Sequence, residues 1–380
     1  MSDLKQELMA MIDRRLDSYQ PIPGLRERVI GNVGSRVDAA EPMVRRSLMV
    51  VSALGLAIAV VVVMMHSLSF PRSLPSHIEG VIPSQAPWSG PGMAPRLSEA
   101  LGWDEKDGYL LMFGGNKPNA GGGPPGLGDT WAWQAGQWKQ LAPATSPPPG
   151  FGVMVEDPGN GHMLMVDSTL TATGNDVQST WSWDGSTWTD LHLGTNPHIS
   201  PAAQVANDTS GQPVVIDQAQ SWIWINAAWQ RVNLDSPMPG RSLFGLAPDP
   251  EISGVLLTGG VASTIGGFVN DTLKWQNGSW SQISTKVAPT GGPSDAAYDA
   301  DRKQVVVFDE IDASTWTFSG GNWTQIHPSH SPATSRNDLN SRITYDPVDR
   351  KVVLIYNHLD GFGKISNETW VWDGADWTLG

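Results

Sequence analysis

The chain of 380 residues contains no cysteine. Without a thiol it can form no disulfide, no thiolate zinc site and no cysteine nucleophile. The patterns G-x-S-x-G and H-E-x-x-H and the EF-hand loop are missing as well. The sequence therefore carries none of the short signatures of a serine hydrolase, a zinc peptidase or an EF-hand protein, and we predict no catalytic residue and no cofactor from it.

Positive charge is scarce over most of the chain. The sequence has 24 Lys and Arg against 38 Asp and Glu, for a net charge of −14. Residues 1–46 are almost neutral, whereas from residue 70 onward 16 basic and 31 acidic residues give −15. Such a surface repels nucleic acid and anionic lipid. We therefore expect no nucleic-acid partner.

One long hydrophobic run interrupts an otherwise mixed sequence. Residues 48–65 (LMVVSALGLAIAVVVVMM) carry no charge, and with their flanks they approach the roughly 20 residues that span a bilayer. The run lies too far from the N-terminus for a signal peptide. Because Arg45 and Arg46 precede it, the positive-inside rule places residues 1–46 in the cytoplasm and the remainder outside. We expect a single-pass protein of the cell membrane with a transmembrane helix over residues 47–69, the alternative being a buried core helix.

The segments on either side of this run are short. Within residues 1–46, apolar residues recur every four positions from Leu4 to Leu16, which predicts a helix. Residues 1–40 are then either a docking site for a cytoplasmic partner or a juxtamembrane helix without one. Residues 70–95 hold six prolines among Ser and Gly and are typical of an extended linker.

Tryptophan is abundant in the remainder of the chain, after residue 95. Six times the chain places an aromatic residue, four other residues and then a tryptophan, at intervals of 41 to 54 residues. A repeat of this length indicates one supersecondary unit copied around a ring or along a stack. The pairs are Trp133 and Trp138, Trp183 and Trp188, Trp224 and Trp229, Trp275 and Trp280, Phe318 and Trp323, and Trp372 and Trp377.

The four residues inside each pair predict a β-hairpin. The central two are Ala-Gly, Gly-Ser, Asn-Ala, Asn-Gly, Gly-Gly and Gly-Ala in chain order. Gly and Asn tolerate the positive φ of type I′ and II′ turns, so a two-residue turn sets the two aromatic residues opposite each other. Such a cross-strand pair contributes some tenths of a kcal/mol up to about 1 kcal/mol.

Two more strands complete each unit. A short apolar run precedes each hairpin, and another short strand, ending at an acidic turn, precedes each run. We count the strand that ends at an acidic turn as the last strand of the unit before it. The strand Leu97–Trp103 is of this kind but precedes the first unit, whereas the chain stops at Gly380 with no such strand after the last hairpin. We therefore expect the strand near Leu97 to complete the last blade of a closed ring, which leaves no exposed sheet edge.

The repeat resembles the kelch repeat over residues 96–380. The resemblance depends on Phe113-Gly114-Gly115 and Thr258-Gly259-Gly260 for the glycine pair and on the spaced tryptophans of all six units. It implies an all-β fold, a six-bladed propeller of kelch type. Kelch propellers serve as protein-binding modules, scaffolds and occasional enzymes. One forms the catalytic domain of galactose oxidase, whose copper chemistry needs a tyrosine cross-linked to cysteine and is therefore excluded here.

The long connections predict where function lies. In an up-and-down blade the long stretches, such as residues 115–128, 168–179 and 357–367, emerge at one rim, where binding loops are commonly placed. We expect a module that recognises a protein or glycan there; the alternatives are an extracytoplasmic carbohydrate-active hydrolase or lyase and a purely structural envelope protein. An enzyme predicts acidic or histidine side chains at the axial mouth of a rim, and a binder predicts an apolar or aromatic patch on the loops.

A few side chains are candidates for more specific roles. His327, His330 and His358 form the one candidate metal set, and ordinary loop histidines are the alternative. The acidic run 309–312 is either a calcium contact or a solvated turn. Residues 182–188 resemble the Asp box of sialidases but are one residue short, which favours a hairpin of the local repeat.

Overall fold

The structure is a computed structural model that describes residues 93–117, 126–170, 176–232, 240–263, 267–292, 294–333, 341–359 and 365–380. Contacts divide the chain into two compact units, Met1–Pro71 and Arg72–Gly380, and all described residues belong to the second. The predicted cytoplasmic segment, membrane span and most of the linker lie outside the described residues. Within the described part, no helix is long and apolar enough to cross a membrane.

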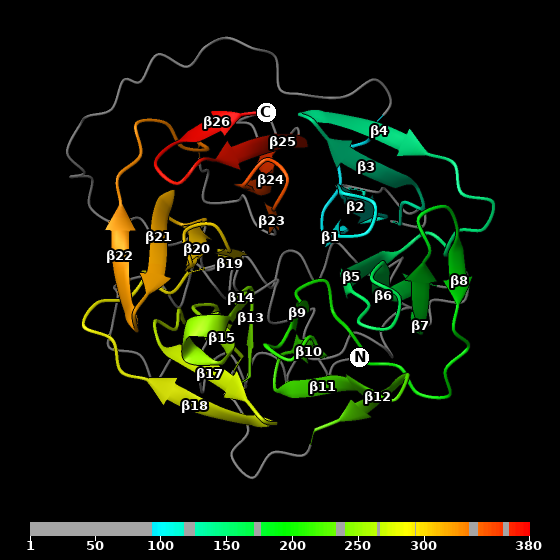
Figure 1. Cartoon of the computed structure of the whole chain (residues 1–380), viewed down its shortest axis with the longest axis horizontal. Coiled ribbons are helices and arrows are strands. Elements are labelled where there is room, and N and C mark those ends of the chain that lie inside the picture. Colours follow the sequence, from blue (N-terminus) through cyan, green and yellow to red (C-terminus); the bar gives the residue numbers. More distant parts are fainter. Residues whose placement is uncertain are drawn as a thin grey trace, which may run out of the picture. The chain divides into compact units, whose positions relative to one another are not determined.

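Six four-stranded antiparallel sheets surround a central axis (Figure 1). The described residues contain a single helical turn, η1 (Pro250–Ile252), and one extra two-stranded sheet, β13 (Arg241–Ser242) with β16 (Val261–Ala262). The all-β, six-bladed propeller predicted from the sequence is confirmed. From the axis outward, blade 1 holds β1 (Ala100–Asp104), β2 (Tyr109–Phe113), β3 (Thr130–Gln134) and β4 (Gln137–Leu141); blade 2 holds β5 (Phe151–Glu156), β6 (Met163–Leu170), β7 (Asp176–Trp183) and β8 (Trp188–Asp190); blade 3 holds β9 (Gln204–Asn207), β10 (Pro213–Asp217), β11 (Gln220–Ile225) and β12 (Ala228–Arg231); blade 4 holds β14 (Gly245–Asp249), β15 (Gly254–Thr258), β17 (Thr272–Gln276) and β18 (Ser279–Ile283); blade 5 holds β19 (Ser294–Asp299), β20 (Gln304–Asp309), β21 (Ser314–Ser319) and β22 (Asn322–Ile326); and blade 6 holds β23 (Arg342–Asp346), β24 (Lys351–Leu359), β25 (Ile365–Trp372) and β26 (Trp377–Leu379).

The prediction that the N-terminal strand completes the last blade is wrong. β1 pairs with β2, with Ala100 opposite Phe113 and Asp104 opposite Tyr109, and blade 6 takes all four strands from the end of the chain. A short turn joins β1 to β2, so the two form a local hairpin at little cost in loop entropy. Every blade therefore takes its four strands in chain order from one stretch of sequence, with only the short β16 inserted between β15 and β17 of blade 4.

Side chains close the ring between blades 1 and 6. The backbone N–H of Arg96 donates to Oδ1 of Asn367 at 2.9 Å, and Nδ2 of Asn367 donates to the carbonyl of Arg96 at 3.0 Å. The indole of Trp138 adds a hydrogen bond to Oγ1 of Thr369 at 3.1 Å. The two ends of the propeller thus meet without a shared sheet.

The aromatic pairs lie directly opposite each other in all six outer hairpins, with ring centroids 5.0 to 5.4 Å apart. Four of the turns have positive φ at both central residues, as in Ala135 and Gly136, which matches a type I′ turn. The turn after Trp183 differs, because Asp184 Oδ1 accepts hydrogen bonds from the backbone of Ser186 and Thr187. The Asp-box-like stretch is thus a side-chain-capped hairpin turn.

The second tryptophan of each hairpin also links neighbouring blades. Its indole N–H donates to a hydroxyl on the third strand of the preceding blade, three residues before that blade's first aromatic residue. The six bonds run from Trp138 to Thr369 (3.1 Å), Trp188 to Thr130 (3.1 Å), Trp229 to Thr180 (3.0 Å), Trp280 to Ser221 (3.4 Å), Trp323 to Thr272 (2.8 Å) and Trp377 to Thr315 (2.8 Å).

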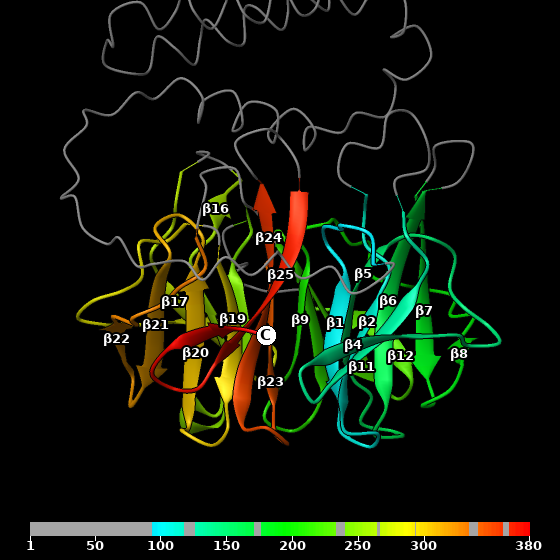
Figure 2. The same cartoon turned by 90° about the horizontal axis from the view of Figure 1, so that it is seen from above.

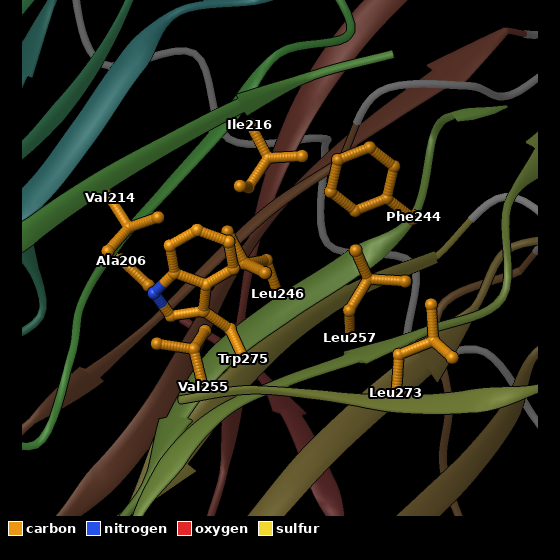
Figure 3. Packing of buried hydrophobic residues seen from close by; sticks show 9 residues of the cluster. All are labelled: Ala206, Val214, Ile216, Phe244, Leu246, Val255, Leu257, Leu273 and Trp275. Atoms are coloured by element: carbon orange, nitrogen blue, oxygen red, sulfur yellow. The ribbon is translucent and has the colours of Figure 1, made fainter. Parts of the chain in front are cut away.

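The hydrophobic core is divided among the junctions between blades. Between blades 3 and 4, Val214 and Ile216 of β10 pack against Leu246 of β14, Leu257 of β15 and Trp275 of β17 (Figure 3). The middle strands contribute unbroken apolar runs because both of their faces are covered by neighbouring blades. Each blade therefore depends on its neighbours for burial.

Two of the predicted loops are extensions of strands. β6 and β7 remain paired to Leu170 and Asp176, and β24 and β25 to Leu359 and Ile365. Figure 2 shows these longer strands rising at the same end of the propeller. We call this end, where the second strand of each blade ends, the long-loop rim. The opposite end, with the short turns after the inner strands, is the short-turn rim.

Candidate functional site

All inner strands begin at the long-loop rim, because each is followed by a second strand that returns there. The sequence placed the long loops at this rim, and the change in blade boundaries does not alter that placement. Strand direction alternates in the same way in the predicted and in the observed blades. The residues that start the inner strands therefore lie at the axial end of this rim.

A cavity of about 60 Å³ lies on the axis, lined by residues from all six inner strands. Its polar lining residues are Glu99, Gln204, Asp295 and Arg342. We call it the axial cavity. A smaller cavity of about 10 Å³ shares Gln204 and Arg342 with it and adds Glu310. Three carboxylates and one guanidinium thus gather at this point of the axis.

Arg342, at the start of β23, reaches across the axial cavity. Its Nε donates to the backbone carbonyl of Glu99 at 3.2 Å and its Nη2 to the carbonyl of Pro201 at 3.4 Å. These contacts connect blade 6 with the segments that enter blades 1 and 3. They hold the guanidinium on backbone oxygens.

Asp295 and Glu310 are buried and hydrogen-bonded. Asp295 accepts from the backbone N–H of Ala296 at 2.9 Å and of Ile343 at 3.1 Å. Glu310 accepts from the backbone N–H of Ser341 at 2.8 Å and from its hydroxyl. Burial raises the pKa of each carboxyl to about 7, and the nearby charge of Arg342 opposes the shift in both.

Glu99 has a different environment. It is fully buried, and no other described residue donates a hydrogen bond to either oxygen of its carboxylate. Burial raises the pKa of this carboxyl, against the attraction of Arg342 and then of Arg96. Three carboxyl groups thus face one guanidinium, and a bound cation would favour the ionised form of each carboxyl.

The long-loop rim also exposes apolar side chains. Leu170 and Val177, at the tip of the β6–β7 pair, are 45% and 50% exposed, and Phe268, after β16, is 46% exposed. Exposed apolar side chains mark a binding surface where they form a contiguous patch rimmed by polar residues. Acidic groups on the axis and exposed apolar side chains at the β6–β7 tip and after β16 thus occur at the same end.

The described part of the structure does not bring His327, His330 and His358 together. His330 pairs with Asp376 in the outer hairpin of blade 6, with Nδ1 2.7 Å from Oδ2. His327 is exposed. For His358 the structure describes only the backbone in β24, opposite Ser366. The metal set of His327, His330 and His358 remains a prediction.

The acidic run is not a solvated turn at its first two positions. Asp309 and Glu310 are buried, and Asp309 accepts hydrogen bonds from the hydroxyl of Thr290 and from the backbone of Ile311. Burial raises the pKa of Asp309 to about 6. Asp309, at the end of the second strand of blade 5, therefore binds the segment that leads into the first strand of that blade.

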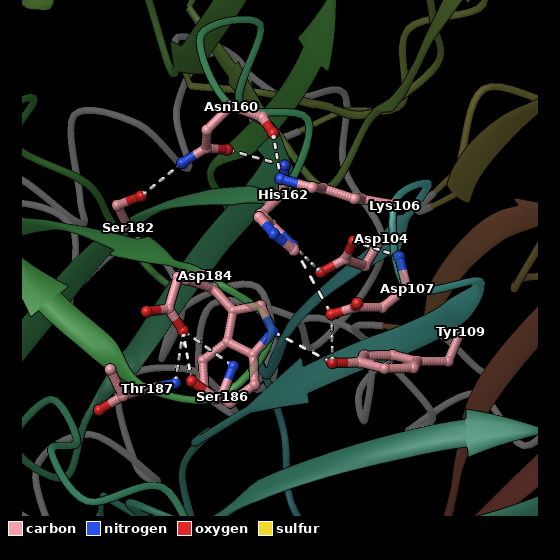
Figure 4. A network of polar contacts seen from close by, with 11 residues as sticks. Asp104, Lys106, Asp107, Tyr109, Asn160, His162, Ser182, Asp184, Ser186 and Thr187 are labelled. Atoms are coloured by element: carbon pink, nitrogen blue, oxygen red, sulfur yellow. Dashed lines mark hydrogen bonds and ion pairs between the residues drawn. The ribbon is translucent and has the colours of Figure 1, made fainter.

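A second polar group lies at the short-turn rim between blades 1 and 2 (Figure 4). Nδ1 of His162 is 3.2 Å from Oδ2 of Asp104 and 3.6 Å from Oδ2 of Asp107, and such a set can hold a metal ion. Each side chain has partners already, since Asp104 caps its own turn and Asp107 accepts from the hydroxyl of Tyr109 at 3.1 Å. The contact between Nδ1 of His162 and Asp104 explains this geometry without a metal.

Compared by sequence, the chain matches no family model and no curated protein. Compared by structure, it matches 337 chains. One is described as "Structure of YjhT"; it is 10% identical, with a TM-score of 0.49, over 75% of this chain and 97% of that one. Such similarity carries nothing about function, which has to be argued from the site.

The axial residues were missed in the sequence, although a signal for them exists. Asp295 and Arg342 each lie four residues before the aspartate that ends their strand, Asp299 and Asp346. The corresponding position in blade 4 is Gly245. A charged residue at the start of such a strand indicates a polar axial cavity only if the strand is the innermost of its blade. The sequence alone did not show which strand is innermost.

Proposed function

We propose that this protein is a recognition module at the cell surface, whose long-loop rim binds a protein or glycan. The observation that carries the proposal is the exposure of Leu170, Val177 and Phe268 on the rim that also holds the acidic axial cavity. A propeller fold is compatible with binding and with enzymatic roles, so the surface chemistry decides between them. Apolar anchors around a charged centre favour binding.

Kelch type is the finer assignment that we propose for the propeller. Gly114 and Gly115 have φ of +64° and +99°, and the pair in blade 4 has nearly the same values. Arg96 donates to the carbonyl of Gly114 at 2.9 Å and pairs with Asp129 through two bonds of 2.8 Å. Arg241 repeats this arrangement with Gly259 and Asp271 in blade 4. The two glycine pairs are therefore specific structural elements of a repeat.

Membrane anchoring through residues 47–69, with the propeller outside the cytoplasm, is part of the proposal. Its support is the uncharged run at residues 48–65 and the preceding Arg45 and Arg46. An alkaline phosphatase fused after Gly380 is expected to be active, and the same enzyme fused before Met1 inactive. The reverse pattern would refute the orientation.

A carbohydrate-active enzyme is the second candidate. Asp295 and Glu310 favour it, because a buried carboxyl with a pKa of about 7 can act as a general acid or base at neutral pH. This alternative predicts turnover of a glycan that Asp295→Asn or Glu310→Gln abolishes.

A capture experiment separates the two. Full-length protein in nanodiscs is screened against immobilised glycans and candidate surface proteins, beside the double variant Leu170→Asp/Val177→Asp. Val348→Asp is the matched control, because Val348 is 66% exposed in the short turn after β23. We expect specific capture that the double variant loses and the control keeps. Turnover of a glycan without stable capture would contradict the binding function.

A further inference from the structure

Glu99 is the described carboxylate least accounted for by the fold. Other buried carboxylates with one unpartnered oxygen, such as Asp167 and Asp249, use their second oxygen to accept a hydrogen bond from Thr169 or Glu251. Glu99 receives none from any other described residue at either oxygen. Burying an ionised carboxylate without partners is strongly unfavourable, so the ionised form of Glu99 requires a compensating charge.

Arg342 does not supply the missing partner. Its Nε and Nη2 donate to the backbone carbonyls of Glu99 and Pro201. No described hydrogen bond joins its guanidinium to the Glu99 carboxylate. Glu99 instead lines the axial cavity, as do Gln204 of blade 3, Asp295 of blade 5 and Arg342 itself.

The cavity has the size for a small ion. Its volume of about 60 Å³ exceeds the roughly 10–15 Å³ that one water molecule requires, so it admits an ion with a few waters. Hard cations are bound by carboxylate, amide and water oxygens, and Glu99, Asp295 and Gln204 offer the first two kinds. An ammonium group is bound by the same acceptors through its N–H donors.

We propose that the axial cavity binds a small cation, with Glu99 as its principal ligand and Asp295 and Gln204 completing the site. The shared chemistry is a compact positive charge, either a hard metal ion or the ammonium group of a small organic molecule. This site is independent of what the long-loop rim recognises.

The test titrates cations into full-length protein that has been dialysed against EDTA and then against metal-free buffer. CaCl2, MgCl2 and methylammonium chloride are titrated separately by calorimetry, so that the first two report a metal site and the third an ammonium site. Glu99→Gln keeps the size of the side chain and removes the charge. Asp349→Asn is the control, since Asp349 is an exposed carboxylate in the short turn after β23.

We expect saturable binding of one equivalent of either a metal ion or methylammonium, weakened about tenfold or more by Glu99→Gln and unchanged by Asp349→Asn. Circular dichroism checks that Glu99→Gln is folded; if it is not, Asp295→Asn takes its place with the same expectation. Absence of saturable binding by the unchanged protein for all three salts overturns the proposal, as does equal binding by the folded variant. Repeating the rim capture with Glu99→Gln keeps the two proposals apart, because this substitution removes the principal ligand of the cation and leaves the rim residues intact.

Discussion

At the scale of single residues, Asp167 shows what a buried carboxyl costs this fold. It is fully buried in β6, its Oδ2 accepts from the hydroxyl of Thr169 at 2.8 Å, and its Oδ1 has no partner among the described residues. Burial raises its pKa from 3.8 to about 7. The folded state therefore binds the proton more tightly than the unfolded state, and the protein is more stable with this group protonated.

The consequence is a stability that falls with rising pH. Between the unfolded value near 3.8 and the folded value near 7, this one group lowers the free energy of unfolding by at most about 1.4 kcal/mol per pH unit. Asp167→Asn is expected to lose that part of the slope and to gain stability relative to the unchanged protein at pH 8. Urea unfolding at pH 5 and pH 8 measures it, with the exposed Asp176→Asn of β7 as the control. An identical slope in Asp167→Asn would contradict the account.

At the scale of strands and hairpins, the outer hairpins were predictable because their geometry is local. A turn of Gly and Asn between two aromatic residues fixes the register without any other part of the chain, and Trp133 lies opposite Trp138 as predicted. The positions in the sequence where one blade ends and the next begins were not predictable in the same way. A periodic order of strands is the same wherever the first blade begins, and only the short connection from β1 to β2 decides it.

The bond from tryptophan to threonine stabilises the contact between neighbouring blades. Trp188 is 1% exposed, and its indole N–H donates to Oγ1 of Thr130 at 3.1 Å across the junction of blades 1 and 2. Thr130→Val keeps the shape and leaves this buried donor unsatisfied, which costs about 1–3 kcal/mol in the free energy of unfolding. Chemical denaturation measures the loss. Thr189→Val, on the exposed side of β8, is expected to change stability by no more than about 0.5 kcal/mol, and equal losses in both variants would refute the role of the bond.

At the scale of the whole molecule, the repeat predicts the ring of blades but not the polar residues that line the axial cavity. Hydrophobic spacing and turn residues determine the blades, since these are properties of neighbouring positions. The axial cavity depends on residues as far apart as Glu99 and Arg342, which lie side by side only because the ring closes. Their importance is a matter of burial and missing partners, which no spacing in the sequence records.

Closure without a shared strand makes the junction of blades 1 and 6 the weakest part of the ring. Its buried apolar cluster has four members, Leu110, Trp133, Val353 and Ile355, against nine at the junction of blades 3 and 4, and no covalent connection between described strands joins its two blades. Native-state hydrogen exchange should therefore show β1 and β26 opening at a lower free energy than β10 and β14.

Asn367→Ala removes both of its hydrogen bonds to the backbone of Arg96 across this junction. Two bonds of about 1 kcal/mol each predict amide exchange in β1 and β26 that is about tenfold or more faster, with β10 and β14 unchanged. Asn207→Ala is the matched control, because Nδ2 of Asn207 donates to the carbonyl of Glu156 across the covalently connected junction of blades 2 and 3. We expect that variant to leave exchange in β1 and β26 as it is. Uniform acceleration over all blades by Asn367→Ala would mean that the ring opens as one cooperative unit and that the junction is no weaker than the others.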